Sequence, residues 1–176
     1  RKEGEGTFLN GCQLQRHLLA RNRMMVCPRC IADDMDDTAL DPVLRPYGRA
    51  SWQVMAIRTC ARHKVALTPV DYEQGKHERD DFVLRIEPHI PEILRHVEAA
   101  QERSPSEFER YLQTRLDGGN GGVSSLDDFP FYAVIRMAEL VGAVAIFGPR
   151  IQFGQLDDDG WWRAGAEGFA ILKQGE

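Results

Sequence analysis

The sequence predicts a mainly α fold with a small attached subdomain of tight turns and minor β content. Three observations lead to this prediction. Apolar residues recur with a helical period from residue 88 onward, capping and stop signals divide that stretch into separate helices, and two short pairs of ligand-type residues lie within the first 70 residues. The 176 residues, of which 43% are hydrophobic, are enough to bury a core without disulfides.

Residues 88–176 are predicted to form a bundle of three to four short helices. One apolar face at the i, i+3, i+4, i+7 spacing defines the first helix and is formed by Ile90, Ile93, Leu94 and Val97. The second helix is expected to begin at an N-cap on Ser104, followed by proline at the first position and Glu107 as the capping-box partner. It ends at the glycine-rich loop 118–122.

Two further helices are expected beyond this loop. The third begins with a capping sequence at Ser125 and runs to about Phe147, where a Gly-Pro pair stops it. The fourth begins at the aspartates 157–159, which the positive end of a helix dipole favours.

Residues 1–70 are predicted to form the smaller subdomain. Residues 7–14 have the composition of a short strand, and residues 14–23 are expected to form a short helix. The polar segment 71–87 is interpreted as a linker between this subdomain and the helical residues 88–176.

Two pairs of ligand-type residues dominate the smaller subdomain. Cys27 and Cys30 form a C-x2-C pair, and Cys60 and His63 form a C-x2-H pair after 29 intervening residues. Each pair can place two ligands on one metal from a tight turn, so together they offer three thiolates and one imidazole to a tetrahedral Zn²⁺. A C-x2-C pair also occurs in redox motifs, but the matching C-x2-H pair favours one structural zinc site with no open position.

Other residues of ligand type are interpreted differently. Cys12 has no partner at ligand spacing and is expected to be a buried thiol. Five aspartates between residues 32 and 45 lack the glycine and terminal glutamate of a calcium loop, so we expect a solvated loop there.

Charge is distributed unevenly along the chain. The formal net charge is −5, which argues against a uniformly basic nucleic-acid coat, yet residues 42–70 contain no acid. The cations of this run are Arg45, Arg49, Arg58, Arg62 and Lys64. They are compatible with a surface that contacts phosphate, with an ordinary solvated face, and, for Arg49, with internal support of the cysteine turns.

No catalytic constellation is evident. The chain contains no Gly-x-Ser-x-Gly, no His-Glu-x-x-His and no dinucleotide-binding fingerprint, and we expect that it is not an enzyme. No stretch is long and apolar enough to span a bilayer and no secretory signal is visible, so we expect a cytoplasmic location without membrane association.

Three segments strongly resemble the TniQ family. Residues 26–34 match its C-P-x-C-L-x-x-D knuckle, residues 47–52 match a Tyr-x-Arg-x-x-Trp stretch, and residues 58–67 match its Cys-x-x-His-x-x-x-Leu close. A weaker match covers residues 126–148, which resemble a later helix of the family. The chain departs from many relatives in lacking another cysteine pair in residues 68–77, so the resemblance supports one zinc site only.

The resemblance implies a role in DNA transposition. TniQ-like proteins are thought to help choose the target site and to connect target recognition with an AAA+ regulator, a transposase or a targeting complex, and some act as dimers. It also implies that Cys27, Cys30, Cys60 and His63 bind structural zinc. The leading hypothesis is therefore a zinc-stabilised, non-catalytic adaptor that binds DNA and partner proteins. The alternative is a zinc-stabilised protein–protein interaction module without a direct nucleic-acid role, which the excess of acids in residues 71–176 favours.

Overall fold

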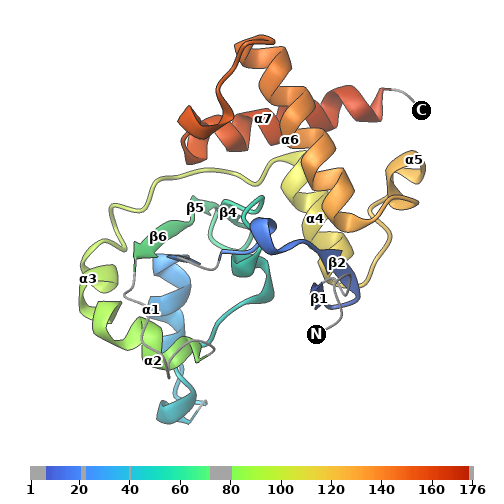
Figure 1. Cartoon of the computed structure of the whole chain (residues 1–176). Helices are drawn as coiled ribbons and strands as arrows, with labels where there is room; N and C mark the ends of the chain where they lie inside the picture. The colour runs from blue at the N-terminus through green and yellow to red at the C-terminus, as the bar shows by residue number, and fades with distance from the viewer. Residues whose placement is uncertain (1–6, 21–22, 40, 72–80, 175–176) are drawn as a thin grey trace. The chain divides into compact units, whose positions relative to one another are not determined.

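The computed structural model describes residues 7–20, 23–39, 41–71 and 81–174 (Figure 1). The chain forms two compact units, each with its own apolar core. As far as they are described, the helical unit comprises Arg1–Leu19, Val54–Arg58 and Pro105–Glu176, and the cysteine unit comprises Ala20–Gln53 and Thr59–Ser104. The prediction of a mainly α fold with a small cysteine-containing part and minor β content is confirmed.

Three long helices build the helical unit. These are α4 (Glu107–Leu116), α6 (Phe131–Phe147) and α7 (Asp158–Lys173), and the short helix α5 (Ser124–Asp127) precedes α6. Helix α7 packs against both α6 and α4, as Figure 1 shows for the crossing of α6 and α7. Their shared core includes Phe108, Leu112, Phe131, Ile135 and Phe169.

Small residues bring α6 and α7 into close contact. A Cβ atom added at Gly142 would lie 1.8 Å from the carbonyl oxygen of Ala164, and one added at Gly168 would lie 1.8 Å from that of Ala138. Both glycines and both alanines are buried. The two helices therefore pack backbone against backbone, which only small side chains at the crossing permit.

The helix starts differ in part from the predictions. Helix α4 is capped by Ser106, whose hydroxyl accepts from the Glu109 N–H in a full capping box, so the predicted cap at Ser104 is wrong. The predicted third helix is interrupted, because Pro130 separates α5 from α6. The predicted start of α7 is confirmed, since Asp157 caps it by accepting from the Gly160 N–H at 2.7 Å.

A hairpin completes the helical unit. Strands β1 (Thr7–Leu9) and β2 (Cys12–Leu14) pair antiparallel around Asn10 and Gly11, both of which have positive φ. An Asn-Gly turn of this kind suits a two-residue hairpin, and it replaces the single strand expected over residues 7–14. Of the helix expected over residues 14–23, the described residues 14–20 and 23 contain one 3₁₀ turn, η1 (Arg16–Leu18).

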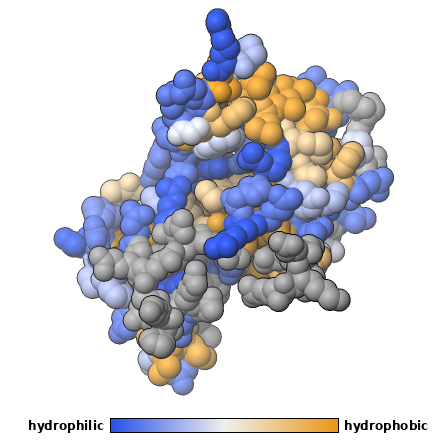
Figure 2. Space-filling view, viewed as in Figure 1, coloured by the Kyte–Doolittle hydropathy of each residue, from blue (hydrophilic) through white to orange (hydrophobic). Residues whose placement is uncertain are grey.

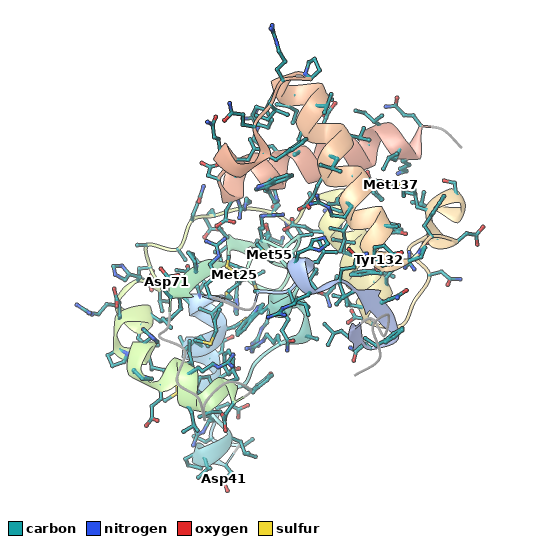
Figure 3. All side chains as sticks on the ribbon, viewed as in Figure 1. Met25, Asp41, Met55, Asp71, Tyr132 and Met137 are labelled. Atoms are coloured by element: carbon teal, nitrogen blue, oxygen red, sulfur yellow. The ribbon has the colours of Figure 1, made fainter. Side chains whose placement is uncertain are left out.

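Helix α6 carries apolar residues around most of its circumference. Its inner face includes Val134, Ile135 and Ala138, which are fully buried, whereas Val144 and Phe147 are 41% and 36% exposed. Figure 2 shows apolar side chains gathered over this helix, and Figure 3 labels Tyr132 and Met137 on it. None of the described helices combines the length and apolar character that a bilayer crossing requires.

The cysteine unit is built on two small antiparallel sheets. Strand β3 (Arg23–Val26) pairs with β6 (Thr68–Asp71), so Met25 and Asp71 lie on neighbouring strands (Figure 3). Strand β4 (Thr59–Cys60) forms a hairpin with β5 (Val65–Ala66). The helices are α1 (Pro28–Asp36), α2 (Phe82–Ile86) and α3 (Ile90–Arg95), and the 3₁₀ turns are η2 (Pro42–Leu44), η3 (Ala50–Gln53) and η4 (Glu87–His89).

The two units do not follow the expected division into residues 1–70, 71–87 and 88–176. Residues 54–58 lie with the helices, because Met55 donates its N–H to the Leu18 carbonyl and Val54 is part of the helical core. The segment up to residue 104 lies with the cysteines, because its end pairs beside β5. Of the expected linker, residues 72–80 lie outside the described residues, and its end forms α2.

Candidate metal centre

The first two ligand residues sit where a strand turns into a helix. Cys27 follows β3 and is the N-cap of α1, with Pro28 at the first helical position. The proline has no N–H to satisfy and its φ suits the first turn, so the helix begins immediately after Cys27. Cys30 then lies in the first turn, and the Ile31 N–H donates to the Cys27 carbonyl at 3.0 Å. One turn of helix therefore brings both thiols to the same point.

The other two ligand residues come from the turn of the β4–β5 hairpin. Cys60 ends β4, and the Lys64 N–H donates to its carbonyl at 2.9 Å. Lys64 has a φ of 52°, which closes the turn tightly. The backbone N–H of His63 points at the Cys60 sulfur at 3.5 Å, so the turn itself directs both side chains to one side.

The four donor atoms converge. They all lie within 4.8 Å of one another. His63 Nδ1 is 3.5 Å from the Cys27 sulfur, 3.3 Å from that of Cys30 and 3.8 Å from that of Cys60. The Cys30 and Cys60 sulfurs are 3.6 Å apart. The four residues selected from their spacing are thus brought together into one group that can hold a metal ion.

Burial and local polarity favour cation binding at this group. The three cysteines are buried at 0%, 1% and 6% exposure, within a core cluster that also contains Trp52. Hydrogen bonds from the Cys27 and Cys30 thiols lower the pKa of Cys60, and the bond with Cys27 together with burial raises the pKa of Cys30. Three crowded thiols cannot all ionise unless a cation compensates their charge.

A second pair of motif residues supports the centre. Arg49 donates twice to the Asp34 carboxylate, at 2.7 and 2.9 Å, and its guanidinium lies over the rings of Tyr47 and Trp52 at 4.4 and 4.6 Å. Asp34 is 4% exposed and lies on α1, one turn beyond Cys30. This bidentate pair therefore connects the helix that carries the first two cysteines with the segment that carries Trp52.

The five cations of the acid-free run differ in their burial and in their partners. Arg58 is 4% exposed and lies in the helical unit, where it donates to Glu139, while Arg49 is engaged by Asp34. Arg58 is therefore not available to phosphate, and the guanidinium of Arg49, whose side chain is 19% exposed, is occupied by the Asp34 carboxylate. Arg62 and Lys64 are exposed beside the metal-binding group, and Arg45 is half-buried and donates to the Met35 carbonyl.

Sequence reasoning missed several residues around the centre. The aspartates placed in a solvated loop begin on α1 instead, and Asp33 lies 3.1 Å from His63 Nε2 and 2.8 Å from Arg62. The role of Asp34 could have been inferred from the sequence, because Asp34 occupies the aspartate position of the C-P-x-C-L-x-x-D motif. No sequence pattern pointed to Asp33. Cys12 is buried in the helical unit and donates to the Arg115 carbonyl at 3.3 Å, in agreement with its interpretation as a structural thiol.

Comparison with known proteins agrees with this geometry. Residues 1–67 match the family model TniQ, and this range includes all four residues of the metal-binding group. No curated protein and no solved structure is significantly similar to the chain. The first 67 of the 176 residues are therefore similar to the TniQ family model, and no comparison covers the rest of the chain.

Proposed function

We propose that this protein is a zinc-stabilised, non-catalytic adaptor in DNA transposition that contributes to target-site selection by binding DNA and partner proteins. The observation that carries the proposal is the four-residue metal-binding group within the TniQ segment. Its partners would be transposition proteins: an AAA+ regulator, a transposase or a targeting complex, with a second copy of the chain as a further partner.

The donor set and its spacing fit zinc. A tetrahedral Zn²⁺ with Zn–S bonds of about 2.3 Å and a Zn–N bond of about 2.0 Å places neighbouring donor atoms about 3.5–3.8 Å apart. The Cys30–Cys60 sulfur–sulfur distance of 3.6 Å and the sulfur–nitrogen distances of 3.3–3.8 Å lie close to these values. Four protein ligands fill the coordination sphere, so Cys27, Cys30, Cys60 and His63 would hold the ion for stability and would leave no position for a substrate.

Exposed cations beside the centre support DNA binding. Arg62 and Lys64 lie on the hairpin turn that carries His63, in a run of 29 residues without an acid. Contacts of this kind with phosphate contribute affinity that depends on salt rather than on sequence. Arg45, Arg49 and Arg58 belonged to the same sequence interpretation, but the burial of Arg58 and the Arg49–Asp34 pair direct the test to the hairpin turn.

The test is duplex binding measured by fluorescence anisotropy over a range of salt concentrations. Neutralising Arg62 and Lys64 in the variant Arg62→Gln/Lys64→Gln should reduce the salt slope by about one per lost phosphate contact. Arg95→Gln, an exposed cation on α3 of the same unit, is the matched control and should leave the slope unchanged. Salt-independent binding, or equal slopes for the two variants, contradicts the proposed DNA contact.

One observation favours the alternative of a protein–protein module without a nucleic-acid role. Three of the five cations in the acid-free run form ion pairs within the chain, Arg49 with Asp34, Arg58 with Glu139 and Arg62 with Asp33. The basic character of the surface is therefore weaker than the sequence implies. A wild-type protein that binds zinc and a transposition protein, yet shows no affinity for duplex DNA at low salt, would establish this alternative.

A further inference from the structure

The carboxylate of Asp33 lies behind one member of the metal-binding group. Its Oδ2 is 3.1 Å from Nε2 of His63 and 2.8 Å from a terminal nitrogen of Arg62. Asp33 projects from α1, three residues after Cys30, whereas His63 and Arg62 come from the hairpin turn. The carboxylate therefore connects the two segments that supply the ligands.

The ring of His63 presents its two nitrogens to different partners. Nδ1 lies 3.3–3.8 Å from the three sulfurs, and Nε2 lies against Asp33. A neutral imidazole carries its proton on only one nitrogen, and a carboxylate oxygen can only accept. The His63–Asp33 contact is a hydrogen bond when Nε2 carries the proton and donates it to the carboxylate. The lone pair of Nδ1 is then available to bind a metal ion.

We propose that Asp33 is a positioning residue for the metal centre: it holds His63 with its proton on Nε2, so that Nδ1 is the ligand atom. The proposal rests on the metal centre of the proposed function and is independent of DNA and partner binding. The ion pair with Arg62 holds the carboxylate in place, so a residue of the proposed DNA surface also takes part in fixing the ligand.

The neighbouring aspartates have other roles, which makes the assignment specific. Asp34 is engaged by Arg49. Asp37 accepts from the Ala39 N–H and Asp41 accepts from the Val43 N–H, so each caps its own local turn. Asp36 is exposed at the last position of α1 and provides a control of equal charge on the same helix.

The experiment compares zinc affinities by competition with a chromophoric chelator for the full chain and for Asp33→Ala, Asp33→Asn and Asp36→Ala. Loss of a group that orients a ligand typically weakens metal binding about 10- to 100-fold, which we expect for Asp33→Ala. Asp33→Asn keeps an oxygen that can accept from Nε2–H, so its loss should be smaller. Asp36→Ala should bind zinc as the wild type does.

A spectroscopic readout separates positioning from general destabilisation. Long-range ¹H–¹⁵N correlation spectra of the zinc-loaded protein should show His63 protonated on Nε2, with this proton protected from exchange. The protection should persist in Asp33→Asn and disappear in Asp33→Ala. A protected Nε2–H in Asp33→Ala, together with zinc affinity equal to that of Asp36→Ala, would overturn the proposal.

Further outcomes separate failure of the Asp33 inference from misfolding of a variant and from failure of the proposed function. If Asp33→Ala does not fold, Asp33→Asn decides alone: affinity below wild type with Nε2–H retained supports the proposal, and unchanged affinity overturns it. Wild-type protein that binds no zinc would overturn the metal centre itself and this inference with it. Normal zinc binding without DNA affinity would contradict only the proposed DNA contact.

Discussion

Arg58 donates to Glu139 at 3.1 Å, and the two side chains are only 5% and 6% exposed. The backbone N–H of Arg58 also donates to Glu109 at 2.8 Å, and the other oxygen of that carboxylate accepts from the indole of Trp162 at 2.9 Å. A cation that the charge pattern assigned to a phosphate-binding surface is therefore part of a buried polar network in the helical unit. The segment 54–58 is held among the helices by charge as well as by apolar contacts.

Removing Arg58 should destabilise the helical unit strongly. Arg58→Ala leaves the buried carboxylate of Glu139 without its buried partner and with only the exposed Arg136 at 3.8 Å, and breaking a buried pair in this way costs about 3–5 kcal/mol. Urea unfolding followed by circular dichroism measures the loss. The double variant Arg58→Leu/Glu139→Leu should lose less than Arg58→Ala, because no uncompensated charge remains. A loss below about 1 kcal/mol for Arg58→Ala, as for an exposed ion pair, would contradict the buried network.

The Arg49–Asp34 pair predicts that lysine cannot replace Arg49. Lysine has neither the planar fork that donates to both carboxylate oxygens nor the flat face that lies over Tyr47 and Trp52. We expect Arg49→Lys to cost about 1.5–3 kcal/mol in unfolding free energy, the range for hydrogen bonds to charged groups. Arg95→Lys on exposed α3 is the control and should change little. Equal stability of the two variants would show that the pair contributes nothing specific.

The candidate metal-binding group was predictable because its geometry is local. Each pair spans one tight turn, so the spacing alone places two donors together, and burial of both turns in one core unites them. Asp33 was not predictable, because its partners lie about thirty residues away on another turn. The same limit applies to Arg58, whose charge partner is 81 positions distant. Charge counts along the sequence cannot distinguish a solvated cation from one paired in a core.

The start of α4 illustrates the same limit. Both Ser104 and Ser106 precede a glutamate at the capping-box distance, so the local pattern allows two equivalent starts. The structure selects Ser106, whose partner Glu109 also accepts from the backbone of Arg58 and from Trp162. Contacts over more than fifty residues therefore decide between two local solutions.

Removal of the metal should unfold the cysteine unit selectively. Structural zinc sites contribute about 10–16 kcal/mol of apparent binding free energy at neutral pH, more than a small unit can replace by apolar burial. After chelation, or in Cys60→Ser, amide hydrogen exchange should lose protection in β3 and α1 and retain it in α6 and α7. Cys12→Ser changes a cysteine outside the metal-binding group, so this control variant should keep the metal content of the wild type. Retained protection in α1 after chelation would contradict a structural role.

Because Cys12 is buried, its thiol should react at higher pH in the folded protein than in the denatured protein. Burial raises the pKa of the Cys12 thiol above its ordinary value of 9.0. The folded state therefore prefers the neutral thiol, and the stability that this preference contributes is present below pH 9.0 and is lost as the pH rises through the folded pKa. Alkylation of Cys12 followed by peptide mapping should show a midpoint above that of the same residue in denatured protein. Coincident midpoints would indicate that Cys12 is accessible in the folded state.

The crossing of α6 and α7 predicts that one methyl group at Gly142 is not tolerated. An added Cβ atom would lie 1.8 Å from the Ala164 carbonyl oxygen, which belongs to a helix backbone and cannot rotate away. The helices must separate, and overpacking of this kind costs about 1–3 kcal/mol or more despite the higher helix propensity of alanine. Gly154→Ala is the matched control, since nothing lies within 4 Å of its added Cβ atom. Thermal unfolding should show a lower Tm for Gly142→Ala only, and an unchanged Tm would mean that the two helices do not meet backbone to backbone.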